Sequence, residues 1–99
     1  MNVQFRASFS KDLRNIKNKN LLDRIKGVIE NVENAQRLED ISNLKKLKGR
    51  NIYYRIRSGE YRIGLIIENN TIVFVRCLNR KEIYRYFPQI VQQPFQPDR

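Results

Sequence analysis

The chain has 99 residues, of which 20 are Lys or Arg and 10 are Asp or Glu, so its formal net charge is +10. This length allows one domain with a single modest core and excludes a second, and the charge favours nucleic acid, an anionic membrane surface or an acidic protein as partner. No apolar run has the length of a membrane span, and residues 1–6 lack the apolar region of a signal peptide, so we expect a cytoplasmic protein without a membrane partner.

The amino-terminal part is predicted to form a strand and two helices. Val3 and Phe5 alternate with polar residues, which is typical of one short strand over residues 2–6. Ser8 and Ser10 are candidate N-caps of a first helix that ends near residues 18–20. A second helix is predicted from an apolar stripe at Leu21, Leu22, Ile25, Val28, Ile29 and Val32. Together the helices would form a helical hairpin whose apolar face covers a sheet.

Residues 37–50 are predicted to be a loop with one helical turn. This segment ends in a basic cluster, Lys45, Lys46, Lys48 and Arg50. Two interpretations of the cluster stay open, a patch that follows RNA phosphates and a patch that only keeps the protein soluble.

The segment from Ile52 to Ile67 is predicted to form two antiparallel strands. Arg55 and Arg57 project from one face of the first strand, and the apolar side chains of Ile52, Tyr54 and Ile56 project from the other. Ser58-Gly59-Glu60 is a short polar turn whose glycine can take a positive φ, so Tyr61–Ile67 folds back and brings Arg62 close to the arginine pair.

Three neighbouring guanidinium groups repel one another, and phosphate is the first candidate for their counter-ion. The alternative is that Arg55 and Arg57 decorate an exposed face and pair with Glu60 or Glu68.

Asn69-Asn70 predicts a second hairpin turn, because Asn tolerates left-handed backbone conformations. A central strand over residues 71–78 and a short helix over residues 79–86, stopped at Pro88, follow. We expect a single α+β domain over residues 1–88 with a mainly antiparallel four-stranded sheet, and a polar tail with Gln and Pro over residues 89–99.

The residue types restrict the chemistry. The chain has no histidine, its single thiol, Cys77, lies in an apolar stretch and is expected to be buried and inert, and its carboxylates are scattered. Acid–base pairs of the pancreatic-ribonuclease type, histidine-dependent triads and two-metal catalysis are therefore disfavoured, and we expect neither a metal nor another cofactor. Cleavage of RNA by its own 2′-hydroxyl remains, because it needs only positioning, charge stabilisation and two proton transfers.

Two motifs, Tyr54-Arg55-Ile56-Arg57-Ser58-Gly59-Glu60-Tyr61-Arg62-Ile63 and Asn79-Arg80-Lys81-Glu82-Ile83-Tyr84-Arg85, resemble the RelE/ParE superfamily of type II toxins. The resemblance implies a compact toxin that is neutralised by an antitoxin encoded beside it. It matches Arg55, Arg57, Arg62, Arg80 and Tyr84 to catalytic positions of RelE-like members, with Arg62 on the scissile phosphate and Tyr84 stacked on a base or acting in proton transfer. Lys81 and Arg85, like the basic cluster of residues 45–50, are further RNA-binding candidates.

Three functions follow as hypotheses. RelE-like members cut messenger RNA on the ribosome, which makes the ribosome and the message in its A site partners, beside a small acidic antitoxin. ParE-like members inhibit DNA gyrase without nuclease activity. A plain RNA-binding module is favoured only if the positive charge is spread evenly over the surface. We rank the ribosome-dependent endoribonuclease first.

Overall fold

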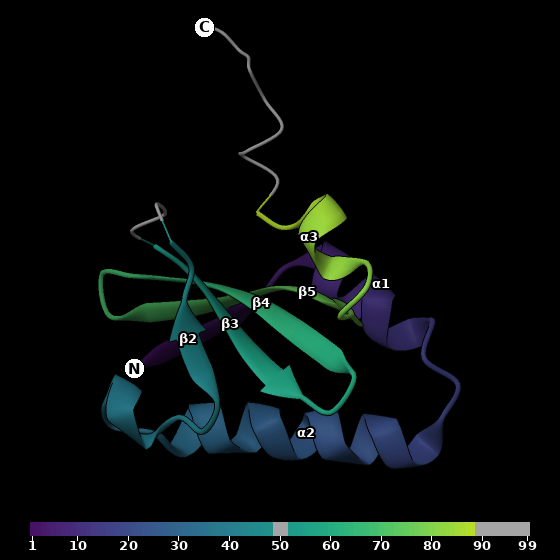
Figure 1. Cartoon of the computed structure of the whole chain (residues 1–99). Coiled ribbons are helices and arrows are strands. Elements are labelled where there is room, and N and C mark those ends of the chain that lie inside the picture. Colours follow the sequence, from purple (N-terminus) through teal and green to yellow (C-terminus); the bar gives the residue numbers. More distant parts are fainter. Residues whose placement is uncertain (49–51, 89–99) are drawn as a thin grey trace, which may run out of the picture.

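The computed structural model describes residues 1–48 and 52–88. Its elements are β1 (Asn2–Phe5), α1 (Ala7–Arg14), α2 (Lys19–Asn34), a 3-10 turn (Leu38–Asp40), β2 (Leu44–Lys46), β3 (Tyr53–Ser58), β4 (Tyr61–Glu68), β5 (Thr71–Asn79) and α3 (Ile83–Tyr86). Figure 1 shows α2 on one face of the sheet and α3 on the other. The predicted α+β class is confirmed. The predicted tail, residues 89–99, lies outside the described residues, and the domain boundary at residue 88 stays a prediction.

The described strands form one sheet in the order β1-β5-β4-β3-β2, with β1 parallel to β5 and the other pairs antiparallel. The sheet has one strand more than predicted, because β2 lies in the segment expected to be a loop. Three residues are too short to show a period of two, and β2 forms because its backbone pairs with β3, where Lys45 lies opposite Arg55. The helical turn predicted in this segment is confirmed as the 3-10 turn.

Both predicted hairpin turns are confirmed. Gly59 has a φ of 58° between β3 and β4, and Asn69 and Asn70 have φ angles of 52° and 59° between β4 and β5. Positive φ at both central residues belongs to a type I′ turn, whose twist matches that of antiparallel strands. These turns fix the register that sets Arg57 opposite Arg62.

The main core lies between the sheet and helices α1 and α2. The predicted stripe of α2 supplies Ile25 and Val32, both 1% exposed, and α1 supplies Phe9. Helix α1 packs mainly on β5, whereas α2 lies against β3. The most buried side chains of the sheet on this face are Ile56, Ile63, Leu65, Ile72, Phe74 and Cys77.

Helix α1 covers the edge of β5 where β1 has ended. The prediction that Ser8 or Ser10 caps this helix is wrong, because α1 begins at Ala7 and Arg6 is its N-cap without a side-chain hydrogen bond. Ser8 Oγ instead donates to the Val75 carbonyl at 2.6 Å. One turn later, Asp12 accepts a hydrogen bond from the Cys77 amide at 2.9 Å. Two polar side chains of one helix face thus satisfy backbone groups that no strand reaches.

The first helix also ends earlier than predicted, at Arg14 instead of near residues 18–20. Asn18 starts the next helix, because its side chain accepts a hydrogen bond from the Leu21 amide at 3.1 Å.

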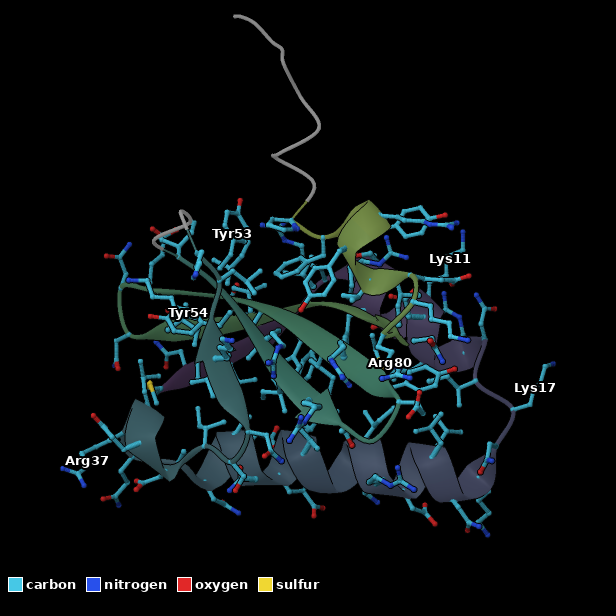
Figure 2. The ribbon with its side chains drawn as sticks, in the orientation of Figure 1. Lys11, Lys17, Arg37, Tyr53, Tyr54 and Arg80 are labelled. Atoms are coloured by element: carbon cyan, nitrogen blue, oxygen red, sulfur yellow. The ribbon has the colours of Figure 1, made fainter. Side chains whose placement is uncertain are left out.

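A smaller cluster on the opposite face holds α3 against the sheet. Phe87 is 1% exposed and packs on Gly64, where an added Cβ would lie 2.7 Å from the Phe87 ring. Tyr53 meets the same ring edge-on, with 5.6 Å between ring centroids. Figure 2 shows Tyr53 on the α3 side of β3 and Tyr54 on the other side, as the strand's alternation requires. The absence of a side chain at Gly64 therefore lets α3, with Tyr84, approach the sheet.

Candidate phosphate-binding site

Arg55, Arg57 and Arg62 lie together on the sheet face that also carries α3. They reach one face because Tyr54 and Ile56, which alternate with them on β3, enter the main core. Arg57 lies directly opposite Arg62 in the β3–β4 register. The predicted proximity of the three arginines is confirmed, and we call them the arginine face.

The electrostatics of Arg62 reflect this crowding. Desolvation lowers the pKa of Arg62 from its ordinary value, and the charges of Arg55, Arg57 and Arg80 lower it further, while Tyr84 acts in the opposite direction. Each protonated arginine thus raises the cost of charge on its neighbours. An anion placed among them would relieve this repulsion.

The guanidinium of Arg62 is held by the hairpin turn. Its Nη1 atom donates to the carbonyl oxygens of Gly59 at 2.8 Å and Tyr61 at 3.0 Å. Within residues 1–48 and 52–88, the structure shows no acceptor for its Nε and Nη2 atoms. A fixed fork with two donors still available suits bidentate contact with a phosphate.

Arg80 stands at the end of this face, tied to the same turn (Figure 2). Its amide donates to the Glu60 carbonyl at 2.7 Å, and its Nε forms an ion pair with Glu60 Oε1 at 2.9 Å. The alternative that Arg55 or Arg57 pairs with Glu60 or Glu68 is wrong, because neither arginine forms an ion pair with a described carboxylate. Both partners are more than half exposed, so their ion pair stabilises the protein by at most about 1 kcal/mol and leaves Arg80 able to exchange partners.

Tyr84 and the predicted lysine cluster meet beside Arg55. A pocket of about 290 Å³ is lined by Lys45, Lys46, Leu47, Lys48, Arg55 and Tyr84. Tyr84 is 54% exposed on α3, so its ring is open to a ligand. We call this hollow the tyrosine pocket. Arg50 lies outside the described residues. Lys81, which precedes α3, and Arg85, which belongs to α3, are exposed and line neither this pocket nor the groove described next.

A larger groove of about 860 Å³ lies at the other end of the arginine face, between α2 and the β3–β4 turn. Arg57, Arg62 and Arg80 line it from the sheet side, and Arg24 and Gly27 line it from α2. We call it the α2 groove. Nothing in the sequence pattern pointed to it, because α2 and the turn are brought together only by the packing of the core.

The role of Arg76, which the sequence left unassigned, is structural. Its Nε and Nη2 atoms donate to both carboxylate oxygens of Asp12, at 2.8 and 3.0 Å, and Asp12 is only 6% exposed. Its Cζ atom also lies 5.1 Å from the centroid of the Tyr86 ring. Arg76 therefore joins α1 and α3 to β5 and is committed to that contact.

Cys77 is buried, as predicted. Desolvation, with a smaller contribution from the Asp12 charge, raises the pKa of its thiol to about 12. The thiol is neutral near pH 7 and is no nucleophile there.

Among residues 1–48 and 52–88, no three side chains of the His, Cys, Asp or Glu type converge as ligands of a metal ion. No helix of the described chain is long and apolar enough to cross a membrane.

Comparisons with known proteins place the chain. A family model described as the ParE toxin of the type II toxin-antitoxin system, parDE, matches residues 3–84. Toxin RelE3 of Methanocaldococcus jannaschii is 46% identical over 89 residues, which are 89% of this chain and 100% of the relative.

Comparison with solved structures gives the same family as the sequence comparisons. The crystal structure of a RelB-RelE antitoxin-toxin complex from Methanococcus jannaschii superimposes with a TM-score of 0.73 at 44% identity, covering 86% of this chain and 99% of that one. A RelE-RelB complex from Pyrococcus horikoshii OT3 matches with a TM-score of 0.64 over 80% of this chain and 93% of that one, and at 20% identity it shows the shared fold alone.

Proposed function

The chain belongs to the ParE toxin family and is a RelE-like toxin of a type II toxin-antitoxin system, and from this premise we propose that it is an endoribonuclease that cuts messenger RNA in the ribosomal A site. The single observation that carries the proposal is the convergence of Arg55, Arg57 and Arg62 on one sheet face. None of the three forms an ion pair with a described carboxylate.

The proposed reaction needs no metal and no cofactor. The 2′-hydroxyl oxygen attacks the neighbouring phosphorus, the bond from phosphorus to the 5′-oxygen breaks, and the products are a 2′,3′-cyclic phosphate and a 5′-hydroxyl. One proton leaves the 2′-oxygen and one is delivered to the 5′-oxygen. The pentacoordinate phosphorus carries extra negative charge, which fixed cationic donors stabilise more than they stabilise the ground state.

The role of each residue follows from its position and from the chemical type of its side chain. Arg62 has the fixed guanidinium and holds the scissile phosphate, with Arg55 and Arg57 beside it and Arg80 at the end of the face. A guanidinium offers N–H donors and positive charge but no acceptor, so these residues act as electrostatic clamps rather than as bases. Tyr84 offers an exposed ring for stacking on a base and a phenol for proton transfer. Lys45, Lys46 and Lys48 contact phosphates of the same strand.

We also propose a small acidic antitoxin as partner, by analogy with the RelB-RelE complex. The net charge of +10 and the arginine face favour an acidic segment that covers Arg55, Arg57 and Arg62. Binding of this kind weakens as salt rises.

The test is to induce the gene without its neighbour and to map new 5′ ends in cellular RNA. We expect translation to stop first, with fragments that end in a 2′,3′-cyclic phosphate, and we expect deoxyribose at the cut position to abolish cleavage.

A second candidate, inhibition of DNA gyrase, is favoured by the family model, whose description names ParE. Rapid double-strand breaks in DNA with intact messenger RNA would select it and overturn the nuclease proposal.

A further inference from the structure

The α2 groove lies on the far side of the arginine face from the tyrosine pocket. Arg55 lines the tyrosine pocket, and Arg57, two residues along β3, lines the α2 groove. Two residues of a strand span about 7 Å, comparable to the spacing of successive phosphates along an extended nucleic-acid strand. A single strand whose phosphate lies between these arginines therefore has a hollow on each side.

Helix α2 adds a cation to this end of the site. A Cβ placed on Gly59 would lie 2.6 Å from Arg24 Nη1, so the Arg24 guanidinium rests directly against the β3–β4 turn. Arg62 Nη1 binds the carbonyl oxygen of the same glycine. Two guanidinium groups from different elements thus flank one turn, and no described carboxylate forms an ion pair with Arg24.

The charge of the groove is strongly one-sided. Its lining holds four arginines, Arg24, Arg57, Arg62 and Arg80, against one carboxylate, Glu60, which is paired with Arg80. Such a concentration of cations in a concave surface attracts polyanions.

The groove also has room and an unused polar group. Gly27 lies in the middle of α2, where glycine is a poor helix former, and a Cβ built on it meets no atom within 4 Å. Ser58 lines the groove, is 7% exposed, and its hydroxyl has no hydrogen-bond partner among the described residues. Buried hydroxyl groups normally have a partner, and a ribose or a base edge would supply one.

From these observations we infer that the α2 groove is a nucleotide subsite, in which Arg24 binds the phosphate next to the scissile one on the side away from Tyr84. The inference rests on the proposed nuclease function, since it gives the path of the same RNA strand. It assigns Arg24 and Gly27 to substrate binding, where they affect affinity and position rather than the chemical step.

The test measures binding of the full-length protein to a fluorescent single-stranded RNA of twelve nucleotides with 2′-O-methyl sugars, which cannot be cleaved. Arg24→Gln should lower the affinity about 3- to 10-fold, and one lost phosphate contact should reduce the slope of log K against log salt by about 0.7. Lys26→Gln is the matched control, since it removes one positive charge from an exposed position of the same helix outside the groove. It should leave the slope unchanged.

A second, independent test fills the α2 groove with a larger side chain and measures the affinity for RNA again. Gly27→Leu places a residue of higher helix propensity in α2 and fills the α2 groove with a side chain. It should therefore lower the affinity for RNA about 10-fold without lowering the thermal stability. Asn20→Leu adds the same side chain at an exposed position outside the groove and should bind as the wild type does.

The failures are distinguishable. Wild-type protein that neither binds the RNA nor cuts messages on ribosomes would overturn the proposed function and this inference together. Wild-type binding that Arg62→Ala abolishes but Arg24→Gln and Gly27→Leu leave intact would overturn the subsite alone. Loss of antitoxin affinity in these two variants with unchanged RNA affinity would also overturn it and assign the groove to the antitoxin.

Discussion

Replacing Arg62 and replacing Arg76 should damage the protein in opposite ways, although both are arginines of the same sheet. Arg62 points its fixed guanidinium to the arginine face and forms no ion pair with a described carboxylate. Arg76 is locked to Asp12 through two hydrogen bonds. The first arginine is available to a ligand, and the second is used by the fold.

Arg62→Ala should cost activity and spare folding. Removal of one preorganised donor to a transition-state charge typically lowers the rate about 10²- to 10³-fold, or roughly 3 to 4 kcal/mol. The free energy of unfolding should change by less than about 0.5 kcal/mol, because the loss of two hydrogen bonds to turn carbonyls is offset by relief from Arg55, Arg57 and Arg80. Arg62→Lys should recover little activity, because a point charge does not reproduce bidentate contact.

Arg76→Ala should do the reverse. It leaves the carboxylate of Asp12, 6% exposed, with the Cys77 amide as its remaining donor in the described structure. Breaking a buried pair in this way destabilises a protein by about 3 to 5 kcal/mol. Since Arg76 is itself 18% exposed, we expect about 2 to 4 kcal/mol here.

The assays are urea denaturation for stability and message cleavage on programmed ribosomes, at a temperature where both variants are folded. A fully active Arg62→Ala protein, or one that is simply unfolded, would refute the reasoning and move the phosphate site elsewhere. An Arg76→Ala protein as stable as the wild type would show that the Asp12 contact contributes nothing.

Three further perturbations test the supports of the site. Gly64→Ala should drive the Phe87 ring off the sheet, since the new Cβ would lie 2.7 Å from it; we expect a loss of about 1 to 3 kcal/mol by urea denaturation, partly restored in the double variant with Phe87→Leu. Tyr84→Phe should keep the affinity for RNA if the ring only stacks, and Tyr84→Ala should weaken binding by about 1 to 3 kcal/mol. Equal binding by the wild type and both variants in a fluorescence titration would remove Tyr84 from the site. Cys77 should resist alkylation at pH 8 until the protein unfolds. Its pKa is raised from 9.0 to about 12, so its contribution to stability is complete below pH 9 and is lost as pH rises towards 12; a Cys77→Ala protein with the same pH slope of stability over that range would contradict this.

The sequence by itself determined the features that depend on near neighbours. Alternation over Tyr54, Arg55, Ile56 and Arg57 predicted one apolar and one cationic face, because successive side chains of a strand point to opposite sides. Gly59 and the Asn69-Asn70 pair predicted the two turns through their tolerance of positive φ, and the turns then set Arg62 beside Arg57. The stripe of α2 predicted the helix because its period spans several turns.

Only the tertiary structure decided which distant groups meet. Asp12 and Arg76 are 64 positions apart, and nothing within a few residues of either indicates the pairing. The same holds for β2, which becomes a strand only by pairing with β3 and thereby brings Lys45 to Arg55 and Tyr84. Arg24 is a third case, because it contacts the turn at Gly59 only through the packing of α2 against the sheet. Local periodicity and turn stereochemistry act over a few residues, whereas these contacts are fixed by how the shared core is filled, and that depends on the whole chain at once.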